Sequence, residues 1–413
     1  MTAITRIQDF DDPTYDPFLS DELTFGSHAD PYPRLAQLRE QASVHETSYR
    51  CLMGLADALK PDRKYFTVLG YDAVNTVLTS PEVYGNGAYV FNLGISFGRS
   101  ISTMDAPEHV RYRRIFQGAF APAVVAQWGE SVVAPVIDGL IARFESTGTA
   151  DLVADFAIRY PFEVIYRQLD MPQHDIATFQ RLAIAQTDFS QPEKAVEAGR
   201  KLGVYFAGMM AARRQAPRDD LITRLVETEI EGEKLPDEIL IAFLRQLMNA
   251  AGDTTYRGTC VLLTALLENP DQFEAVRADR SLIAPTIDEA LRWDGPVLAQ
   301  SRMALQDTVL AGVTIPKGSM VDVVAGSANR DPSRYPDPDR FNILRPKGPT
   351  YMAFSRGPHI CIGQHLARIE MTRALSAVLD RLPGLRLDPD KPRPQLRGAM
   401  MRVPQHIHVR FDA

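Results

Sequence analysis

The chain has 413 residues, of which 45% are hydrophobic and 23% are charged, so it has enough apolar side chains for a large buried core. Its formal net charge of −7 argues against a nucleic-acid partner. Cys51, Cys260 and Cys361 are its only cysteines, and they fit neither a disulfide framework nor a zinc-ligand spacing. Length alone favours two or three domains.

The N-terminal residues lack the apolar core of a signal peptide. No apolar run approaches the roughly 18 residues that are typical of a membrane span. Widely spaced cysteines in odd number favour a reducing compartment. We therefore expect a cytoplasmic protein without a membrane anchor.

Apolar spacing and turn residues divide the chain into segments of different type. Residues up to about 19 are expected to form an extended arm, and residues 31–41 the first helix. Apolar residues recur at three- and four-residue spacing from about 107 to 291, which predicts a mostly helical body. A loop at 346–357 precedes a last helix at 364–382. Strands are expected at 65–69, at 309–324 with a break at Pro316-Lys317-Gly318, and at 396–411.

Residues 105–114 carry a cluster of basic side chains. His109 and Arg113 are four residues apart and share one face of an expected helix. Both side chains can donate charge-assisted hydrogen bonds to carboxylates. The alternative is an ordinary basic helix face, and it remains open for Arg111 and Arg114.

Small residues interrupt the expected helix at 237–267, in the motif Asn249-Ala250-Ala251-Gly252-Asp253-Thr254-Thr255. They sacrifice helix propensity but let a bulky group lie against the backbone. A threonine hydroxyl here can bond to a preceding carbonyl and bend the helix. Asp253 beside Thr254 places a carboxylate next to a hydroxyl, which suits proton transfer. Taken alone, the motif fits a packing notch against another helix better.

Glu289 and Arg292 are three residues apart, so they form a pair on one helix face. Exposed pairs of this kind are common and contribute little to stability. Taken alone, the pair is best explained as a solvated surface pair. A proline-rich segment follows it at 330–341.

Cys361 lies at the end of a glycine-punctuated loop, directly before the helix expected at 364–382. The N–H groups at a helix start favour the thiolate form of a cysteine. A thiolate is a metal ligand or a nucleophile, and His359 is a candidate base for the second role. The remaining alternative is a buried, inert cysteine.

The loop at 354–363 resembles the haem-binding loop of the cytochromes P-450, whose pattern is Phe-x-x-Gly-x-His/Arg-x-Cys-x-Gly. Ala367 and Glu370 follow at the family's offsets, and Ser355 stands where a glycine is frequent. The resemblance implies that Cys361 is the axial ligand of a haem iron. A thiolate ligand pushes electron density onto the iron and favours O–O cleavage.

The other motifs resemble the same family, and the resemblance extends from about residue 20 to the C-terminus. It implies catalytic roles in oxygen activation for Thr254 and Asp253, with Ala251 standing where glycine is usual. It makes Glu289 and Arg292 structural supports of the cysteine loop. The residues that it implies to bind the haem are His109, Arg113, Arg302, His359, Cys361, Gly363 and Ala250, with Cys361 as the metal ligand.

The implied fold is mainly α with small β-sheets, in one domain over residues 1–413, with haem b between the long central helix and the cysteine-loop helix. The implied activity is that of a haem-thiolate monooxygenase, which uses O2 and electrons from a separate ferredoxin and reductase. Alternatives are a peroxygenase driven by hydrogen peroxide and a haem sensor or carrier without turnover. We also expect Arg111, Arg114, Arg356 and Arg368 to form a docking face for the ferredoxin.

Three segments are expected to line the substrate pocket: 88–97, 296–299 and 398–401. They are mostly apolar, which suits a mid-sized hydrophobic substrate such as a terpenoid, steroid, fatty or aromatic molecule. Gln246 and Asn249 offer a polar contact to such a substrate. The alternative, which we favour slightly, is that each amide bonds a neighbouring backbone group.

Overall fold

The computed structural model describes residues 6–55, 62–230 and 232–412. Its α-helices are α1 Pro17–Phe25, α2 Tyr32–Gln41, α3 Tyr49–Leu52, α4 Tyr71–Thr79, α5 Leu93–Phe97, α6 Glu108–Ala119, α7 Pro122–Trp128, α8 Ala134–Ile141, α9 Tyr160–Gln168, α10 Ile176–Ala185, α11 Pro192–Gln215, α12 Leu221–Glu227, α13 Asp237–Glu268, α14 Pro270–Ala278, α15 Ile283–Trp293, α16 Ala325–Asn329 and α17 Gln364–Arg381. Short 3₁₀ or π segments lie at Gly87–Phe91, Gly129–Val133, Leu152–Ala157, Gln173–Asp175, Arg280–Leu282 and Gly357–His359.

The strands are short and belong to several small sheets. They are β1 Val44–His45, β2 Tyr65–Val68, β3 Tyr84–Gly85, β4 Thr149–Asp151, β5 Glu229–Ile230, β6 Glu233–Lys234, β7 Gln300–Ala304, β8 Thr308–Leu310, β9 Val313–Ile315, β10 Met320–Val323, β11 Arg386–Leu387, β12 Leu396–Arg397, β13 Val403–Pro404 and β14 His408–Arg410.

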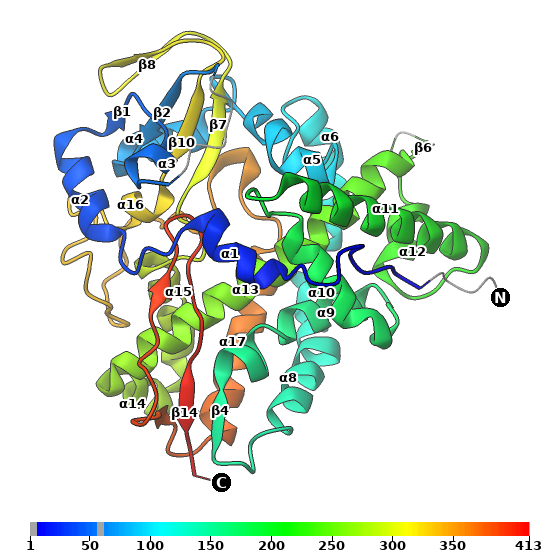
Figure 1. The fold of residues 1–413 in the computed structure, drawn as a ribbon, viewed down its shortest axis with the longest axis vertical. Coiled ribbons are helices and arrows are strands. Elements are labelled where there is room, and N and C mark those ends of the chain that lie inside the picture. Colours follow the sequence, from blue (N-terminus) through cyan, green and yellow to red (C-terminus); the bar gives the residue numbers. More distant parts are fainter. Residues whose placement is uncertain (1–5, 56–61, 231, 413) are drawn as a thin grey trace.

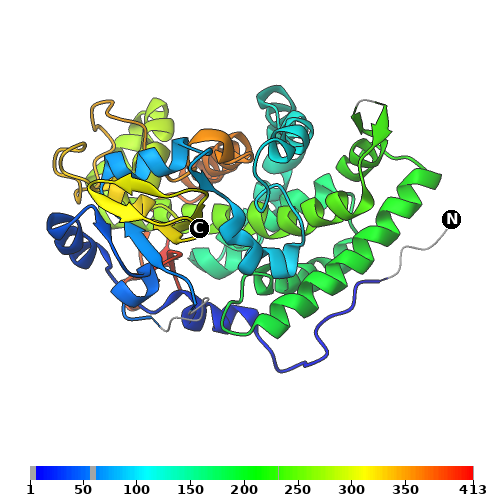
Figure 2. The same cartoon turned by 90° about the horizontal axis from the view of Figure 1, so that it is seen from above.

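The largest sheet has five strands in the order β1-β2-β10-β7-β3. Only β10 and β2 are parallel within it, and the other neighbours are antiparallel. Figure 1 shows this sheet on one side of the molecule and most of the helices on the other, and Figure 2 shows the same division from above. The mainly α architecture with small sheets confirms the expected fold class.

α13 is the central helix of the helical side. Asp237 and Glu238 in its first turn interact favourably with the positive end of the helix dipole. The helix is capped at its C-terminus by Asn269, and Pro270 begins the next helix. It is buried on most faces from Leu247 onward, as expected of a helix at the centre of a core. On one face Phe243 stacks on Phe116 of α6, with ring centroids 3.7 Å apart.

Several expected elements are confirmed and others were missed. The predicted helices at 31–41, 237–267 and 364–382 are α2, α13 and α17. The extended arm ends earlier than expected, because α1 already begins at Pro17 and precedes the helix predicted to be first. The body at 107–291 contains β4 and the β5–β6 hairpin, whose strands are too short to show a two-residue alternation.

The stretch Glu108–Ile141 is an exception to the expectation of no membrane-length apolar run. It is long and apolar enough to cross a membrane, by length and composition alone. In the fold it is divided into α6, α7, a π segment and α8. Phe116, Val125 and Val133 along it are fully buried in the core of the protein. Part of its apolar character is therefore explained by packing, since 39% of its apolar window is buried.

Candidate functional site

The cysteine loop is held by its own backbone. The Cys361 N–H donates to the Phe354 carbonyl at 2.8 Å, which closes the loop just before α17. Gly357 has φ +69°, and a Cβ there would lie 2.2 Å from the Leu78 carbonyl oxygen, so only glycine fits. Ser355 has φ +60°, the left-handed region that favours glycine, at the position where the family often has one.

Cys361 lies in the wall of a cavity of about 330 Å³ between α13 and the start of α17. Burial raises the pKa of its thiol, although the N–H groups of Gly363 and Gln364 and the charge of Arg113 act in the opposite direction. The N–H groups at the helix start favour the thiolate, as expected, but burial has the larger effect on the pKa. A cation bonded to the sulfur would favour the thiolate.

Most of the expected cofactor-binding residues line this one cavity although they come from distant parts of the chain. They are Arg113, Ala250, Arg302, His359, Cys361 and Gly363. His109 lies behind the wall and stacks on His359, with ring centroids 3.8 Å apart and planes tilted by 32°. The fold thus brings all seven expected residues to one place.

A group of cations and hydrogen-bond donors surrounds one end of the cavity. Arg113 donates to the Ile360 carbonyl at 2.5 Å, which fixes α6 against the cysteine loop. Arg302 is buried on β7 and donates to the Ser301 carbonyl at 2.9 Å. His109 Nε2 is buried and has no hydrogen-bond partner among the described residues. These groups suit an anionic ligand that enters the cavity.

The two histidines are electrostatically unusual. Burial and then the charge of Arg113 lower the pKa of His109 to about 4. Burial, and then His109, Arg302 and Arg113, lower the pKa of His359 to about 2. Both rings are therefore neutral at physiological pH. His359 is held by Asn86, whose Nδ2 lies 3.0 Å from its Nδ1, a contact that sequence reasoning missed.

Thr254 and Asp253 are neighbours in the sequence but point to different sides of α13. Thr254 lines the cavity, and its hydroxyl donates to the Ala250 carbonyl at 3.0 Å. Asp253 is buried and accepts from Arg257 Nε at 3.0 Å, one turn further along the helix. Consecutive residues of an α-helix are about 100° apart, which explains the separation. The expected carboxylate–hydroxyl pair does not share one face.

Gly252 serves packing. A Cβ at this position would lie 2.3 Å from the Phe162 ring of α9, so the missing side chain lets α9 and α13 approach closely. Ala250 and Ala251 are the small residues of the motif that line the cavity. The packing-notch alternative therefore holds for Gly252 and not for the two alanines.

Glu289 and Arg292 form a buried network, and the solvated-pair alternative is wrong. Arg292 donates to both Glu289 oxygens, at 2.7 and 2.9 Å, and to the carbonyls of Asn329 and Pro338, both at 2.9 Å. The Asn329 side-chain oxygen in turn accepts a hydrogen bond from the Met352 N–H at 2.7 Å. Met352 lies just before the cysteine loop. The pair thus fixes the segment that leads to Cys361.

The segments expected to line the substrate pocket do so unequally. Tyr89 and Leu93 line the cavity from the first segment and Pro296 and Val297 from the second, and Gln300 was missed. The prediction for residues 398–401 is wrong. None of these residues lines this cavity, and Gly398 and Met401 line a second cavity instead. Met401 is paired with Val297 in a β-bridge.

The two amides have different surroundings. Asn249 donates to the Ala183 carbonyl at 3.0 Å, so it bonds a backbone group, as the favoured alternative predicted. Gln246 lines the cavity and donates to the Ser102 hydroxyl at 2.6 Å. Its amide oxygen is buried and has no hydrogen-bond partner among the described residues. Gln246 is thus the amide that can meet a ligand.

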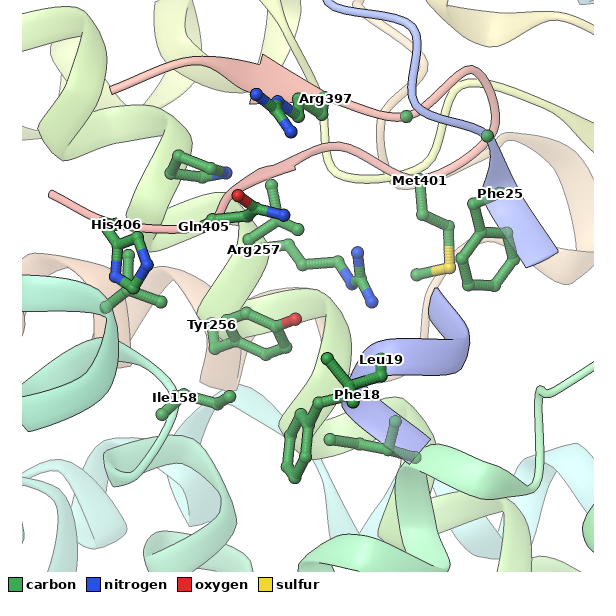
Figure 3. Close-up of a pocket in the computed structure, with 16 residues that line it drawn as sticks. Phe18, Leu19, Phe25, Ile158, Tyr256, Arg257, Arg397, Met401, Gln405 and His406 are labelled. Atoms are coloured by element: carbon green, nitrogen blue, oxygen red, sulfur yellow. The ribbon is translucent and has the colours of Figure 1, made fainter. Parts of the chain in front are cut away.

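A second cavity, of about 440 Å³, lies on the opposite side of α13. Figure 3 shows Tyr256 and Arg257 of α13 on one side of this cavity. They face Phe18 and Leu19 of α1 and Met401, which lies in the turn between β12 and β13. None of the expected haem-binding residues lines it. The cavity that holds Cys361, Thr254 and the cationic group is therefore the candidate active site.

The residues of this cavity are suited to bind a haem. Arg113, Arg302 and His359 line the cavity and match its two carboxylates. The buried, unpartnered His109 Nε2 lies directly behind His359. A Cβ at Gly363 would meet only Cys361 Sγ, at 3.9 Å, so glycine leaves room beside the sulfur. Fold and site together define a mainly helical protein with a cysteine-bearing cavity for a flat, anionic cofactor.

Comparisons with known proteins identify the family. The cytochrome P-450 family model matches residues 197–411. The monooxygenase PikC of Streptomyces venezuelae, a cytochrome P-450, is 32% identical over 90% of this chain and 89% of its own. A putative cytochrome P-450 of Bacillus subtilis is 31% identical over 86% of this chain and 87% of its own.

Solved structures agree. A cytochrome P-450 of Chondromyces apiculatus has a TM-score of 0.83 at 27% identity and covers 97% of this chain and 98% of its own. One of Bacillus megaterium, in complex with testosterone, has a TM-score of 0.80 at 27% identity and covers 93% of this chain and 100% of its own. The chain belongs to the cytochrome P-450 family. It is an oxidoreductase of the monooxygenase type and binds haem b.

Proposed function

We propose that the chain hydroxylates a mid-sized hydrophobic molecule in the cytoplasm, with O2 and electrons from a separate ferredoxin and its reductase. The observation that carries this proposal is the position of Thr254 in an otherwise mostly apolar cavity that also holds Cys361. When bound, the haem supplies the oxygen activation and the electron transfer that side chains cannot provide.

The chain's own residues have distinct tasks in this proposal. Cys361 Sγ holds the iron, and Arg113, Arg302, His109 and His359 hold the carboxylates of the cofactor. The Glu289–Arg292 network keeps the cysteine loop in place while the cofactor binds.

Thr254 Oγ1 is the proton-handling atom of the cavity. Its bond to the Ala250 carbonyl leaves the oxygen lone pairs free to accept a proton or a hydrogen bond from within the cavity. Asp253 is the adjacent carboxylate in the chain. After its side chain turns away from Arg257, it takes up a proton from solvent and passes it to Thr254 Oγ1.

The substrate is a terpenoid, steroid, fatty or aromatic skeleton that carries one hydrogen-bond donor. Leu93, Leu247 and Val297 supply apolar wall. Gln246 Oε1 supplies an acceptor for a hydroxyl or an N–H group. The relative from Bacillus megaterium that was solved with testosterone supports a substrate of about this size and polarity.

A screen of hydrophobic compounds for a haem absorption shift on binding would identify ligands of the holoenzyme. Compounds with a hydroxyl should bind Gln246→Leu more weakly than wild type, by roughly tenfold for one lost hydrogen bond of about 1.5 kcal/mol. Matched compounds without the hydroxyl should bind both proteins equally. Cys361→Ala should lose the red-shifted band of the reduced carbon-monoxide complex, and Cys51→Ala should keep it.

The role of Thr254 is tested by two variants of similar size. Thr254→Val removes the hydroxyl, so product formed per nicotinamide consumed should fall by roughly tenfold or more, with electrons lost to peroxide. Thr254→Ser keeps the hydroxyl and should retain most of the coupling. Equal coupling in wild type and Thr254→Val would exclude this hydroxyl from proton delivery. A peroxide-driven enzyme would show no dependence on the nicotinamide supply at all.

A further inference from the structure

Three metal-ligating side chains meet at the sheet β11-β14-β4, away from the haem cavity. They are Asp151, His406 and His408, and none of them lines the cavity that holds Cys361. Figure 1 shows β4 and β14 side by side at the end of the molecule where the C-terminus lies. The proposed monooxygenase reaction does not use these residues.

The strand register explains why the three side chains converge. β14 is antiparallel to β4, and His408 is paired directly with Asp151. His406 precedes His408 by two residues, and side chains two apart in extended backbone point to the same face. His406 Nδ1 lies 2.7 Å from Asp151 Oδ2, and the two imidazole rings are stacked 4.9 Å apart. The three potential ligand atoms all lie within 4.8 Å of one another.

Asp151 is oriented by the backbone around it. Its Oδ1 accepts from the N–H groups of Val153 at 3.1 Å and Ile407 at 3.0 Å. These bonds leave Oδ2 directed at the histidines. The Asp151 side chain is only 14% exposed, whereas that of His406 is 60% exposed. One ligand is thus fixed and the histidines are accessible from solvent, an arrangement typical of sites whose ligands are held by outer hydrogen bonds.

We propose that Asp151, His406 and His408 bind one divalent transition-metal ion, with Zn²⁺ as the preferred ion. Two imidazole nitrogens and one carboxylate oxygen are a donor set that suits Zn²⁺, with water in the fourth position. Ca²⁺ and Mg²⁺ prefer all-oxygen ligands. In a tetrahedral site with bonds of about 2.0 Å, ligand atoms are about 3.3 Å apart. The imidazole of His408 therefore has to move inward by at most about 1.5 Å, and the 2.7 Å contact between His406 and Asp151 has to widen slightly.

Positively charged side chains near the three ligands lower the expected affinity for Zn²⁺. A shallow hollow beside the histidines is also lined by Arg393 and Arg397. Arg393 is compensated by Glu268, whose two oxygens lie 3.0 and 2.7 Å from its nitrogens. Arg397 donates to the neutral Gln395 at 3.2 Å, so its charge opposes a cation. We therefore expect reversible binding that depends on all three ligands.

The test uses the untagged holoenzyme, its zinc content after equilibrium dialysis, and calorimetric titration with Zn²⁺. Wild type should bind one Zn²⁺ per chain in addition to its iron. His406→Asn and His408→Asn should each weaken this binding by at least about tenfold, the loss expected for one ligand. Asp151→Asn should do the same while keeping the acceptor for Val153 and Ile407.

His174→Asn is the matched control. His174 is 62% exposed and lies 3.6 Å from Asp175, so it is a histidine–carboxylate pair without a second histidine. Its loss should leave Zn²⁺ binding unchanged. Zn²⁺ should also raise the Tm of wild type and of His174→Asn, but not that of His408→Asn, because it links β14 to β4. Equal binding by wild type and His408→Asn, or equal weakening in His174→Asn, would overturn the proposal.

Discussion

The stacked histidines at the edge of the haem cavity are neutral because the protein desolvates them and places arginines beside them. His109 has a pKa of about 4 and His359 one of about 2, against an ordinary value of 6.5. Carboxylates of the cofactor would act in the opposite direction and favour the protonated rings. The two residues therefore couple cofactor binding to protonation.

This coupling predicts a pH dependence of the haem-free protein. Between pH 6.5 and about 4, the unfolded chain binds a proton at His109 that the folded chain rejects, so the free energy of unfolding decreases as pH falls. For His359 the decrease in the free energy of unfolding continues as the pH falls toward 2. Urea unfolding between pH 7.5 and 4.5 should show a smaller decrease in His109→Gln than in wild type. His174→Gln, at an exposed position, should behave like wild type.

Carboxylates also titrate in this range, so the comparison between variants carries the test. The same decrease in His109→Gln and in wild type would show that His109 does not keep a lowered pKa. Bound haem should reduce the decrease in wild type, because its carboxylates stabilise the protonated ring.

At the level of elements, α13 combines two functions on opposite faces. Thr254 lines the haem cavity, whereas Gly252 receives the Phe162 ring of α9. Gly252→Ala should therefore lower the free energy of unfolding by about 1–3 kcal/mol, the usual effect of overpacking a core. Denaturant unfolding of the holoenzyme would measure it.

The control is a helical glycine with open space around it. No atom lies within 4 Å of a Cβ built at Gly208 of α11, so Gly208→Ala should raise stability by up to about 1 kcal/mol through helix propensity. If Gly252→Ala were also stabilising, Phe162 would have to move without cost, and the packing role of Gly252 would be wrong.

Long periodic elements could be predicted from the sequence, and elements defined by tertiary contacts could not. α13 and α17 were predicted to within one residue, since each has many turns of apolar spacing. β4, with three residues, exists because β14 pairs with it. The turn at Ala311-Gly312, which separates β8 from β9 by two left-handed residues, was also missed within the strand expected at 309–324.

The same limit applies to the site. The resemblance of the motifs to those of the cytochromes P-450 predicted which residues meet at the cysteine cavity. It did not predict that Asp253 turns to Arg257, that Asn86 holds His359, or that Met401 pairs with Val297 in a β-bridge. These contacts depend on helix phase and on chain segments that meet only in the fold.

At the scale of the whole molecule, the protein has a net charge of −7, yet the family depends on an electron donor that must dock. Arg113 fixes α6 against the cysteine loop through the Ile360 carbonyl. The exposed Arg114 is the next residue of that helix. Arg368 is less available than expected, because it is paired with Asp288 and Tyr351. We hypothesise that an acidic ferredoxin docks mainly on α6.

This hypothesis predicts that Arg114→Glu slows reduction of the haem by a ferredoxin by roughly tenfold at low ionic strength, since complementary charge raises association rates by at least that factor. Salt should slow the wild type and leave the variant almost unaffected, because exposed charges are screened beyond about 10 Å at 0.1 M. Arg34→Glu changes the net charge by the same amount, but it lies on α2, far from α6 in Figure 1. The haem of this variant should be reduced at the wild-type rate. Substrate binding should be the same in all three proteins. Equal slowing by both substitutions would mean that net charge alone governs the encounter, and an Arg114→Glu rate equal to wild type would exclude α6 as the docking face.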